Sequence, residues 1–173
     1  MRAFDFATVP HIHVQWGGAA RLGELMKGWF PAGRVLVVTD RFLHGSGLLN
    51  EALASLATHG YPAVVFDAVE ADPAESIVRD CVLLATRERA DIVVGLGGGS
   101  SMDVAKVAAA IARSGQPISE AYGIGNLRAG RLSLVQVPTT AGTGSEVTRI
   151  SILTTPESTK LGIVADTLYA DRV

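Results

Sequence analysis

One stretch of the sequence decides the fold: Ala90-Asp-Ile-Val-Val-Gly-Leu-Gly-Gly-Gly-Ser-Ser-Met-Asp-Val-Ala-Lys106. Its first half is a short run of mostly β-branched apolar residues, which predicts a buried strand. Its second half opens on serine and aspartate and continues with apolar residues at helical spacing, which predicts a helix. Gly97, Gly98 and Gly99 stand between the two halves. The stretch therefore predicts a strand that turns through three glycines into a helix.

The glycine run predicts a cradle for a phosphate group. Gly97, Gly98 and Gly99 carry no side chains that would keep a bulky anion away from the backbone. The helix behind them directs unpaired N–H groups and the positive end of its dipole at the loop. A tight turn without a ligand is the alternative, but one glycine is enough for a turn and each further glycine costs conformational entropy. We therefore favour phosphate binding.

The run departs from the two common nucleotide-binding patterns. Ser100 stands where G-x-G-x-x-G would need a glycine, and no lysine follows the glycines where the Walker pattern requires one. We expect Ser100 or Ser101 to cap the helix and to donate to a phosphate oxygen. Asp103 would repel a phosphate at close range. It is expected to favour the helix N-terminus, or to accept hydrogen bonds from the loop or from a ligand hydroxyl.

A second segment is rich in hydroxyl groups: Val137-Pro-Thr-Thr-Ala-Gly-Thr-Gly-Ser-Glu-Val-Thr148. It follows a predicted strand, and its glycines allow a ligand to approach the backbone closely. Such a loop can wrap a nucleotide with hydroxyl groups and backbone amides. The alternative is a threonine-rich turn that binds nothing. We favour the nucleotide because glycine is so frequent there.

Two charged residues are further candidates. Asp40 ends a predicted strand, at the edge where open α/β sheets bind ligands. A carboxylate there can accept both hydroxyls of an adenosine ribose and would repel the 2′-phosphate of NADP. The alternative role of Asp40 is to cap a helix or turn that starts at Arg41. Lys160 begins another predicted strand and could reach a cofactor ribose or phosphate, although an isolated lysine is normally solvated.

Short apolar runs alternate with helical stretches along the chain, which predicts a mostly parallel sheet flanked by helices. The expected strands are residues 11–16, 34–40, 63–67, 91–96 and 134–137, and the expected helices are residues 19–27, 48–57, 73–89 and the one behind the glycine run. Pro73 is expected at a first helical position. Two strands at 149–155 and 160–165 predict an antiparallel hairpin. Residues 170–173 resemble the start of another strand, so we expect a C-terminal portion to follow.

Composition restricts the classes of function. The chain has 173 residues, of which 48% are hydrophobic and 18% charged, with a net charge of −2. These values predict one compact domain and exclude the basic surface of a nucleic-acid-binding protein. No apolar run is long enough for a membrane span and no signal-peptide pattern opens the chain, so we expect a cytoplasmic protein. Cys81 is expected to be a small buried residue, and no metal site is expected at His11 and His13.

Gly97-Gly-Gly-Ser-Ser-Met-Asp-Val-Ala-Lys106 and Val137-Pro-Thr-Thr-Ala-Gly-Thr-Gly-Ser-Glu-Val-Thr-Arg149 together resemble the iron-containing (group III) alcohol dehydrogenase family. Both motifs occur in order and at a family-like separation. Val14-Gln-Trp-Gly-Gly and Val37-Val-Thr-Asp40 also resemble the family's opening segments. The resemblance covers nearly the whole chain, but only the N-terminal half of the family's usual length. It implies a Rossmann-like fold, similar to the N-terminal domain of dehydroquinate synthase.

The resemblance also implies a cofactor and the residues that bind it. The glycine run, with Ser100 and Asp103, would hold the pyrophosphate and a nearby ribose, and Asp40 would favour NAD over NADP. Lys160 would reach a ribose hydroxyl. Four threonines would line the adenine and nicotinamide side: Thr139, Thr140, Thr143 and Thr148. Asp72 precedes Pro73 where the family often has Asn-Pro, which leaves a contact at position 72 open.

The resemblance implies that a metal-dependent dehydrogenase moves hydride between an alcohol and nicotinamide. In the family a C-terminal helical domain holds iron or zinc, so residues 1–173 are expected to form only the dinucleotide-binding domain and to be inactive alone. The complete protein would act on a small alcohol or carbonyl compound and could form a homodimer. Three alternatives remain: a maleylacetate reductase-type enzyme, a dehydroquinate synthase-like lyase and a stand-alone nucleotide-binding module.

Overall fold

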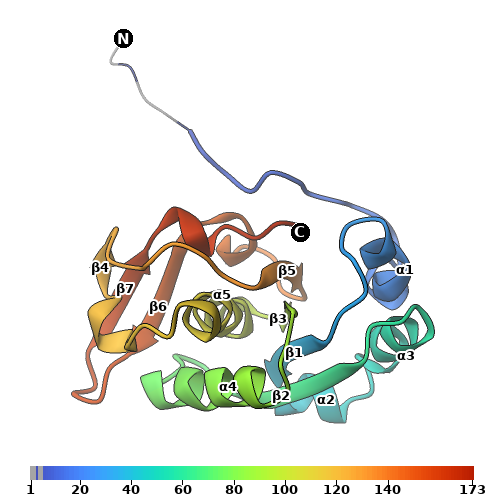
Figure 1. Ribbon diagram of the computed structural model, residues 1–173, viewed down its shortest axis with the longest axis horizontal. Helices are drawn as coiled ribbons and strands as arrows, with labels where there is room; N and C mark the ends of the chain where they lie inside the picture. The colour runs from blue at the N-terminus through green and yellow to red at the C-terminus, as the bar shows by residue number, and fades with distance from the viewer. Residues whose placement is uncertain (1–2, 4–5) are drawn as a thin grey trace.

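A parallel four-stranded sheet forms the centre of the computed structural model, which describes residue 3 and residues 6–173 (Figure 1). The strand order is β2-β1-β3-β5. The strands are β1 (Val35–Asp40), β2 (Ala63–Val69), β3 (Ile92–Gly97) and β5 (Ser133–Pro138). Every residue of β3 is buried, as a strand covered on both faces requires. The four strands predicted at these places are confirmed.

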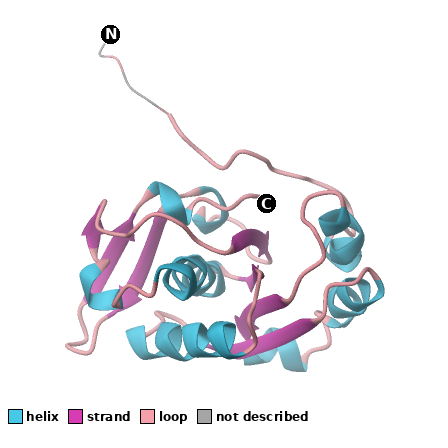
Figure 2. Cartoon of the chain, in the orientation of Figure 1, coloured by secondary structure: helices cyan, strands magenta, loops and turns pink. Residues whose placement is uncertain are grey.

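Helices cover both faces of this sheet (Figure 2). The α-helices are α1 (Leu22–Lys27), α2 (Arg41–Gly45), α3 (Asn50–Thr58), α4 (Glu75–Arg87) and α5 (Gly99–Ser114). Alternate residues of the strands face opposite sides. Leu36 packs in a core that includes α4 and α5, while Val35 and Val37 pack in a second core that includes α1 and α3. The observed fold is the Rossmann-like α/β fold that the sequence predicts.

A second, smaller sheet lies on the far side of α5, so this helix is enclosed between two sheets (Figure 1). Its order is β4-β7-β6, with β4 (Gly123–Ile124), β6 (Ile150–Thr154) and β7 (Lys160–Val164). Strands β6 and β7 pair antiparallel. The predicted hairpin is therefore confirmed. Short 3-10 turns complete the order at Ala19–Arg21, Ile118–Glu120, Ser145–Val147 and Asp166–Leu168.

The predicted strand at residues 11–16 is wrong. Its backbone makes two hydrogen bonds with Val173: the N–H of His13 donates to the Val173 carbonyl at 2.7 Å, and the N–H of Val173 donates to the His11 carbonyl at 3.1 Å. The Gln15 carbonyl accepts from the N–H of Gly18 at 3.0 Å, in a turn. Two hydrogen bonds to a single residue do not make a β-strand, which needs several paired residues. Arg172 in turn makes an isolated parallel bridge to Val135 of β5, so residues 172–173 lie beside the sheet edge.

The predicted start of the third long helix at Pro73 is also wrong. Helix α4 begins at Glu75, and Ala74 precedes it with an extended backbone. The cause is a tertiary contact, because the N–H of Thr154 in β6 donates to the Pro73 carbonyl at 2.9 Å and Ala74 bridges Thr154. This pairing holds Ala74 extended.

Among the described residues, none of the helices combines the length and apolar character that a membrane crossing requires.

Candidate functional site

The candidate site lies at the carboxyl edge of the parallel sheet. Asp40 ends β1, Gly97 ends β3, and Thr139 follows the end of β5. Gly97 and Pro138 are paired in register, and the N–H of Thr139 donates to the Gly97 carbonyl at 2.9 Å. The structure therefore brings together two segments that are far apart in sequence. We call them the glycine loop (residues 97–99) and the threonine loop (residues 139–148).

The two loops approach each other through the glycines. A methyl group at Gly98 would lie 3.5 Å from the Thr140 hydroxyl oxygen, and one at Gly99 would lie 3.3 Å from Thr143 Cβ. Three threonines of the loop are exposed there, namely Thr139, Thr140 and Thr143, and Thr148 is half-buried. The space above the glycine loop is thus bounded by exposed hydroxyl groups. A side chain on either glycine would project into the space between the loops.

The start of α5 presents backbone donors to this space. Gly98 occupies the N-cap position and no side chain caps the helix. The first N–H groups of a helix have no partner within it, so those of Gly99, Ser100 and Ser101 are donors from which an anion can accept. The predicted serine cap is wrong. Gly99 is already helical, so Ser100 and Ser101 stand inside the first turn, beyond the position from which a side chain can cap.

Asp40 serves as the N-cap of α2. Its Oδ1 accepts a hydrogen bond from the backbone N–H of Leu43 at 2.9 Å, and its backbone is extended, as capping residues usually are. The capping role that the sequence left open is therefore confirmed. The carboxylate is half-buried at the edge of the sheet. The cap uses Oδ1 and fixes the orientation of the whole carboxylate.

Asp103 is bonded within the protein. Its Oδ1 accepts from the Ser145 hydroxyl, and its Oδ2 accepts from the N–H of Ile152 at 3.0 Å. The sequence suggests that Asp103 accepts from the glycine loop or from a ligand hydroxyl, whereas these two partners belong to the threonine loop and to β6. The same Oδ1 lies 3.0 Å from the Nζ of Lys106, one helical turn further along α5. Sequence analysis did not single out Lys106 as a functional candidate.

Lys106 is almost fully buried, with 1% of its side chain exposed. Burial lowers the pKa of its ammonium group, and the charges of Asp103 and Glu146 act in the opposite direction. Its Nζ donates to the backbone carbonyls of Ser145, at 2.9 Å, and of Ile150. The sequence could have marked Lys106, because it stands within the apolar run Val104-Ala-Lys-Val-Ala-Ala-Ala-Ile111. A lysine on such a buried helix face needs hydrogen-bond and charge partners.

Lys160 lies at the start of β7 and pairs with Asp72. Its Nζ is 2.7 Å from the Asp72 carboxylate, and both side chains are more than half exposed. The Thr154 hydroxyl donates to the backbone carbonyl of Asp72 at 3.0 Å, which ties this segment to the hairpin. Lys160 is thus neither isolated nor free of a partner. The structure places it beside Asp72, where the family often has asparagine.

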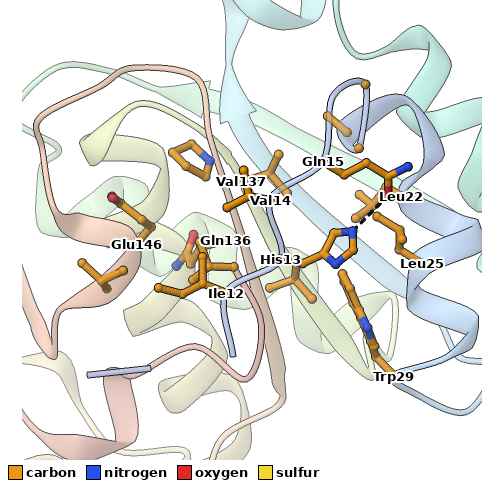
Figure 3. Close-up of a pocket in the computed structure, with 17 residues that line it drawn as sticks. Ile12, His13, Val14, Gln15, Leu22, Leu25, Trp29, Gln136, Val137 and Glu146 are labelled. Atoms are coloured by element: carbon orange, nitrogen blue, oxygen red, sulfur yellow. Dashed lines mark hydrogen bonds between the residues drawn. The ribbon is translucent and has the colours of Figure 1, made fainter. Parts of the chain in front are cut away.

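A cavity of about 520 Å³ lies beside β5 (Figure 3). It is bounded by the extended residues 12–15, by α1 and by residues 135–138. His13 is bonded to Gln15 at 3.0 Å and packs edge-on against Trp29. None of the predicted cofactor residues lines this cavity, but Glu146 and Val147 of the threonine loop do, so the cavity adjoins the candidate site. In the part of the chain that the structure describes, no three His, Cys, Asp or Glu side chains form a group that could hold a metal ion.

The fold and the two facing loops define a Rossmann-like α/β protein with a glycine-rich loop at the carboxyl edge of its sheet. The sequence profile described as iron-containing alcohol dehydrogenase matches residues 10–173. The chain belongs to this family. The metal in the family's name has no fitting ligand set among residue 3 and residues 6–173.

Relatives in the family include two alcohol dehydrogenases. The chain is 36% identical to the NAD-dependent methanol dehydrogenase of Bacillus methanolicus, over 87% of this chain and 39% of the relative. It is 36% identical to long-chain-alcohol dehydrogenase 1 of Geobacillus thermodenitrificans, over 94% of this chain and 41% of the relative. The chain therefore spans about two fifths of the length of these relatives.

Solved structures agree with this assignment. A crystal structure of a 1,3-propanediol oxidoreductase superposes with a TM-score of 0.89 at 32% identity, covering 99% of this chain and 45% of the other. Sulfoacetaldehyde reductase from Bifidobacterium kashiwanohense, solved in complex with NAD+, superposes with a TM-score of 0.88 at 30% identity, covering 99% and 46%. In both comparisons this chain matches less than half of the other chain.

Proposed function

We propose that this chain is the NAD-binding part of a metal-dependent alcohol dehydrogenase. One observation carries the proposal: the glycine loop, a helix N-terminus without a side-chain cap and a hydroxyl-rich loop meet at the carboxyl edge of a parallel sheet. Backbone N–H groups and a helix dipole favour a pyrophosphate there. Because Gly98 and Gly99 have no side chains, an anion can approach the backbone N–H groups closely.

Each group of candidate residues can be assigned to one part of the NAD molecule. Gly97, Gly98, Gly99 and Ser100 would hold the pyrophosphate. Asp40, whose orientation is fixed by its cap, would accept the adenosine ribose hydroxyls and disfavour the 2′-phosphate of NADP. Lys160 would turn from Asp72 to a ribose hydroxyl. The threonines at 139, 140, 143 and 148 would line the adenine and nicotinamide side.

The reaction of the complete protein belongs to the same proposal. Bound NAD would accept hydride from a small alcohol or return it to a carbonyl compound. The NAD-dependent methanol dehydrogenase among the relatives supports this direction. The residues described here would bind and orient the cofactor. Homodimer formation and a cytoplasmic location, which the family resemblance and the sequence suggest, complete the proposal.

Titration with NADH and, separately, NADPH tests the proposal. Asp40→Asn is the informative variant, because an asparagine Oδ1 can still cap α2 while the negative charge is lost. We expect saturable binding with a preference for NADH in the natural chain, and loss of that preference in Asp40→Asn at unchanged stability. A folded chain that binds neither cofactor would overturn the proposal. If Asp40→Asn kept the same preference for NADH over NADPH as the natural chain, the role of Asp40 would be overturned.

A further inference from the structure

We propose that Asp103 and Lys106 form a positioning pair that holds the threonine loop against the glycine loop, and that Asp103 acts through this pair without contacting the cofactor. The inference rests on the proposed function and deepens it. Both residues lie on α5, one turn apart, and α5 begins at Gly99 of the glycine loop. A segment that is bonded to these two side chains is therefore fixed in position relative to the glycine loop.

Lys106 binds the end of the threonine loop through its backbone. Its Nζ donates to the carbonyl of Ser145 at 2.9 Å and to that of Ile150, and it lies 3.5 Å from the carbonyl of Thr148. Three carbonyls from 39 to 44 residues away in sequence thus converge on one ammonium group. Because the group is buried, water cannot replace any of these partners at low cost.

Asp103 binds the same segment from the neighbouring turn. Its carboxylate accepts from the Ser145 hydroxyl and from the N–H of Ile152, and its backbone carbonyl accepts from the Ser151 hydroxyl at 3.1 Å. Oδ1 is therefore bonded to Ser145 within the threonine loop and Oδ2 to Ile152 just beyond it, and Oδ1 also faces Lys106.

The loop needs such a restraint because its own backbone is permissive. Gly142 and Gly144 have positive φ angles of 96° and 68°, and residues 139–143 are exposed. Glycine in this region loses more conformational freedom on ordering than other residues. A buried ion pair contributes little net stability compared with apolar packing, but it specifies one arrangement of its partners. The pair thus fixes where Thr140 and Thr143 stand over Gly98 and Gly99.

The experiment compares Lys106→Met, Asp103→Asn and their combination, with Arg113→Met as the control on the exposed end of α5. NADH affinity is measured by fluorescence at a temperature where circular dichroism shows every variant folded. We expect each single change to weaken NADH binding roughly tenfold or more, because the loop must then be ordered on binding. The combination should be no worse than either change alone, since both remove the same restraint.

Additive losses would overturn the proposal, because they would mean that Asp103 touches the cofactor independently of Lys106. Unchanged affinity in Lys106→Met would overturn it as well. If a variant does not fold, Ser145→Ala removes only the hydroxyl bond to Asp103, and we expect it to weaken NADH binding several-fold.

Hydrogen exchange in the cofactor-free chain separates this inference from the proposed function. The amides of residues 140–145 should exchange faster in Lys106→Met than in Arg113→Met, whether or not NADH binds. Equal exchange in the two variants would overturn the positioning role. Absence of NADH binding by the natural chain, with faster exchange in Lys106→Met, would instead overturn only the proposed function.

Discussion

Replacing Gly98 by alanine separates a binding role of the glycine loop from a purely structural one. Gly98 has φ −79° and ψ −175°, a backbone conformation open to any residue. The nearest atom to the new methyl group would be the Thr140 hydroxyl oxygen at 3.5 Å, which is an ordinary contact. We therefore expect the free energy of unfolding to change by less than about 1 kcal/mol, because alanine restricts the unfolded chain but is a poorer N-cap residue than glycine.

The same methyl group would stand between the two loops, where the pyrophosphate is proposed to approach the backbone. Forcing a group into an occupied space typically costs about 1–3 kcal/mol, so NADH affinity should fall roughly five- to hundredfold. The variant should therefore bind poorly and fold well. If the glycine loop were only a structural turn, Gly98→Ala would not lower NADH affinity while leaving stability intact.

Gly97→Ala is the matched control with the opposite outcome for stability. Its methyl group would lie 2.7 Å from the Ser101 hydroxyl oxygen and 2.9 Å from Ser101 Cβ. Ser101 is buried on α5, and its Cβ cannot move without the helix. We expect a loss of about 1–3 kcal/mol, with a Tm lower by about 2–4 °C for each kcal/mol.

The assay for both variants is urea unfolding followed by circular dichroism, together with NADH fluorescence titration of the folded protein. Gly98→Ala with the affinity of the natural chain would refute the cradle. Gly97→Ala with the stability of the natural chain would refute the steric argument on which both expectations are based.

Three further predictions concern stability and reactivity. Gly23→Ala should destabilise the chain by about 1–3 kcal/mol in urea unfolding despite the better helix propensity of alanine, because the new methyl would lie 2.2 Å from the Ser55 carbonyl oxygen. Burial alone would raise the pKa of Asp171, but the hydrogen bonds from Arg131 and from the N–H of Leu134, together with the charges of Arg131 and Arg172, outweigh it and lower the pKa. The ionised Asp171 therefore stabilises the folded chain fully above the unfolded-state pKa of about 3.9, and this contribution is lost as the pH falls through the lowered folded-state pKa. In Arg131→Met the folded-state pKa is no longer lowered by Arg131, so Tm should fall less steeply below about pH 4 than in the natural chain. Burial raises the pKa of the Cys81 thiol, so a thiol reagent should label it only in denaturant; labelling of the native chain would show that α4 opens.

The sequence predicts the parts of the fold whose signal is local. The apolar strands before Asp40 and Gly97 and the helix behind the glycines follow from periodicity over a few residues, and the structure confirms them. The end of α5 at Gly115 is equally local, since that glycine takes a left-handed conformation with φ 65°. Helix α2 was not predicted as an element, although its cap at Asp40 was foreseen as an alternative.

The failures occur where a distant partner decides the local structure. Residues 11–16 are predicted as a strand, yet the long-range backbone hydrogen bonds described for them go to Val173. Pro73 suits a first helical position, yet pairing with Thr154 keeps it outside α4. Propensity is a weak prior in both cases, because hydrogen bonds to residues about 80 or more positions away override it.

The candidate site shows the same division between composition and geometry. Sequence patterns identify the glycine loop and the threonine loop as unusual, and register between Gly97 and Pro138 brings them together. The pattern also marks Asp103, but it cannot say whether the carboxylate faces a ligand or the protein. Its partners Ser145 and Ile152 lie 42 and 49 residues away, and the balancing charge of Lys106 is hidden in an apolar helix face. A motif residue can therefore be essential to a binding site because it shapes the loop that binds, and the double-variant experiment on Asp103 and Lys106 distinguishes that role from direct contact.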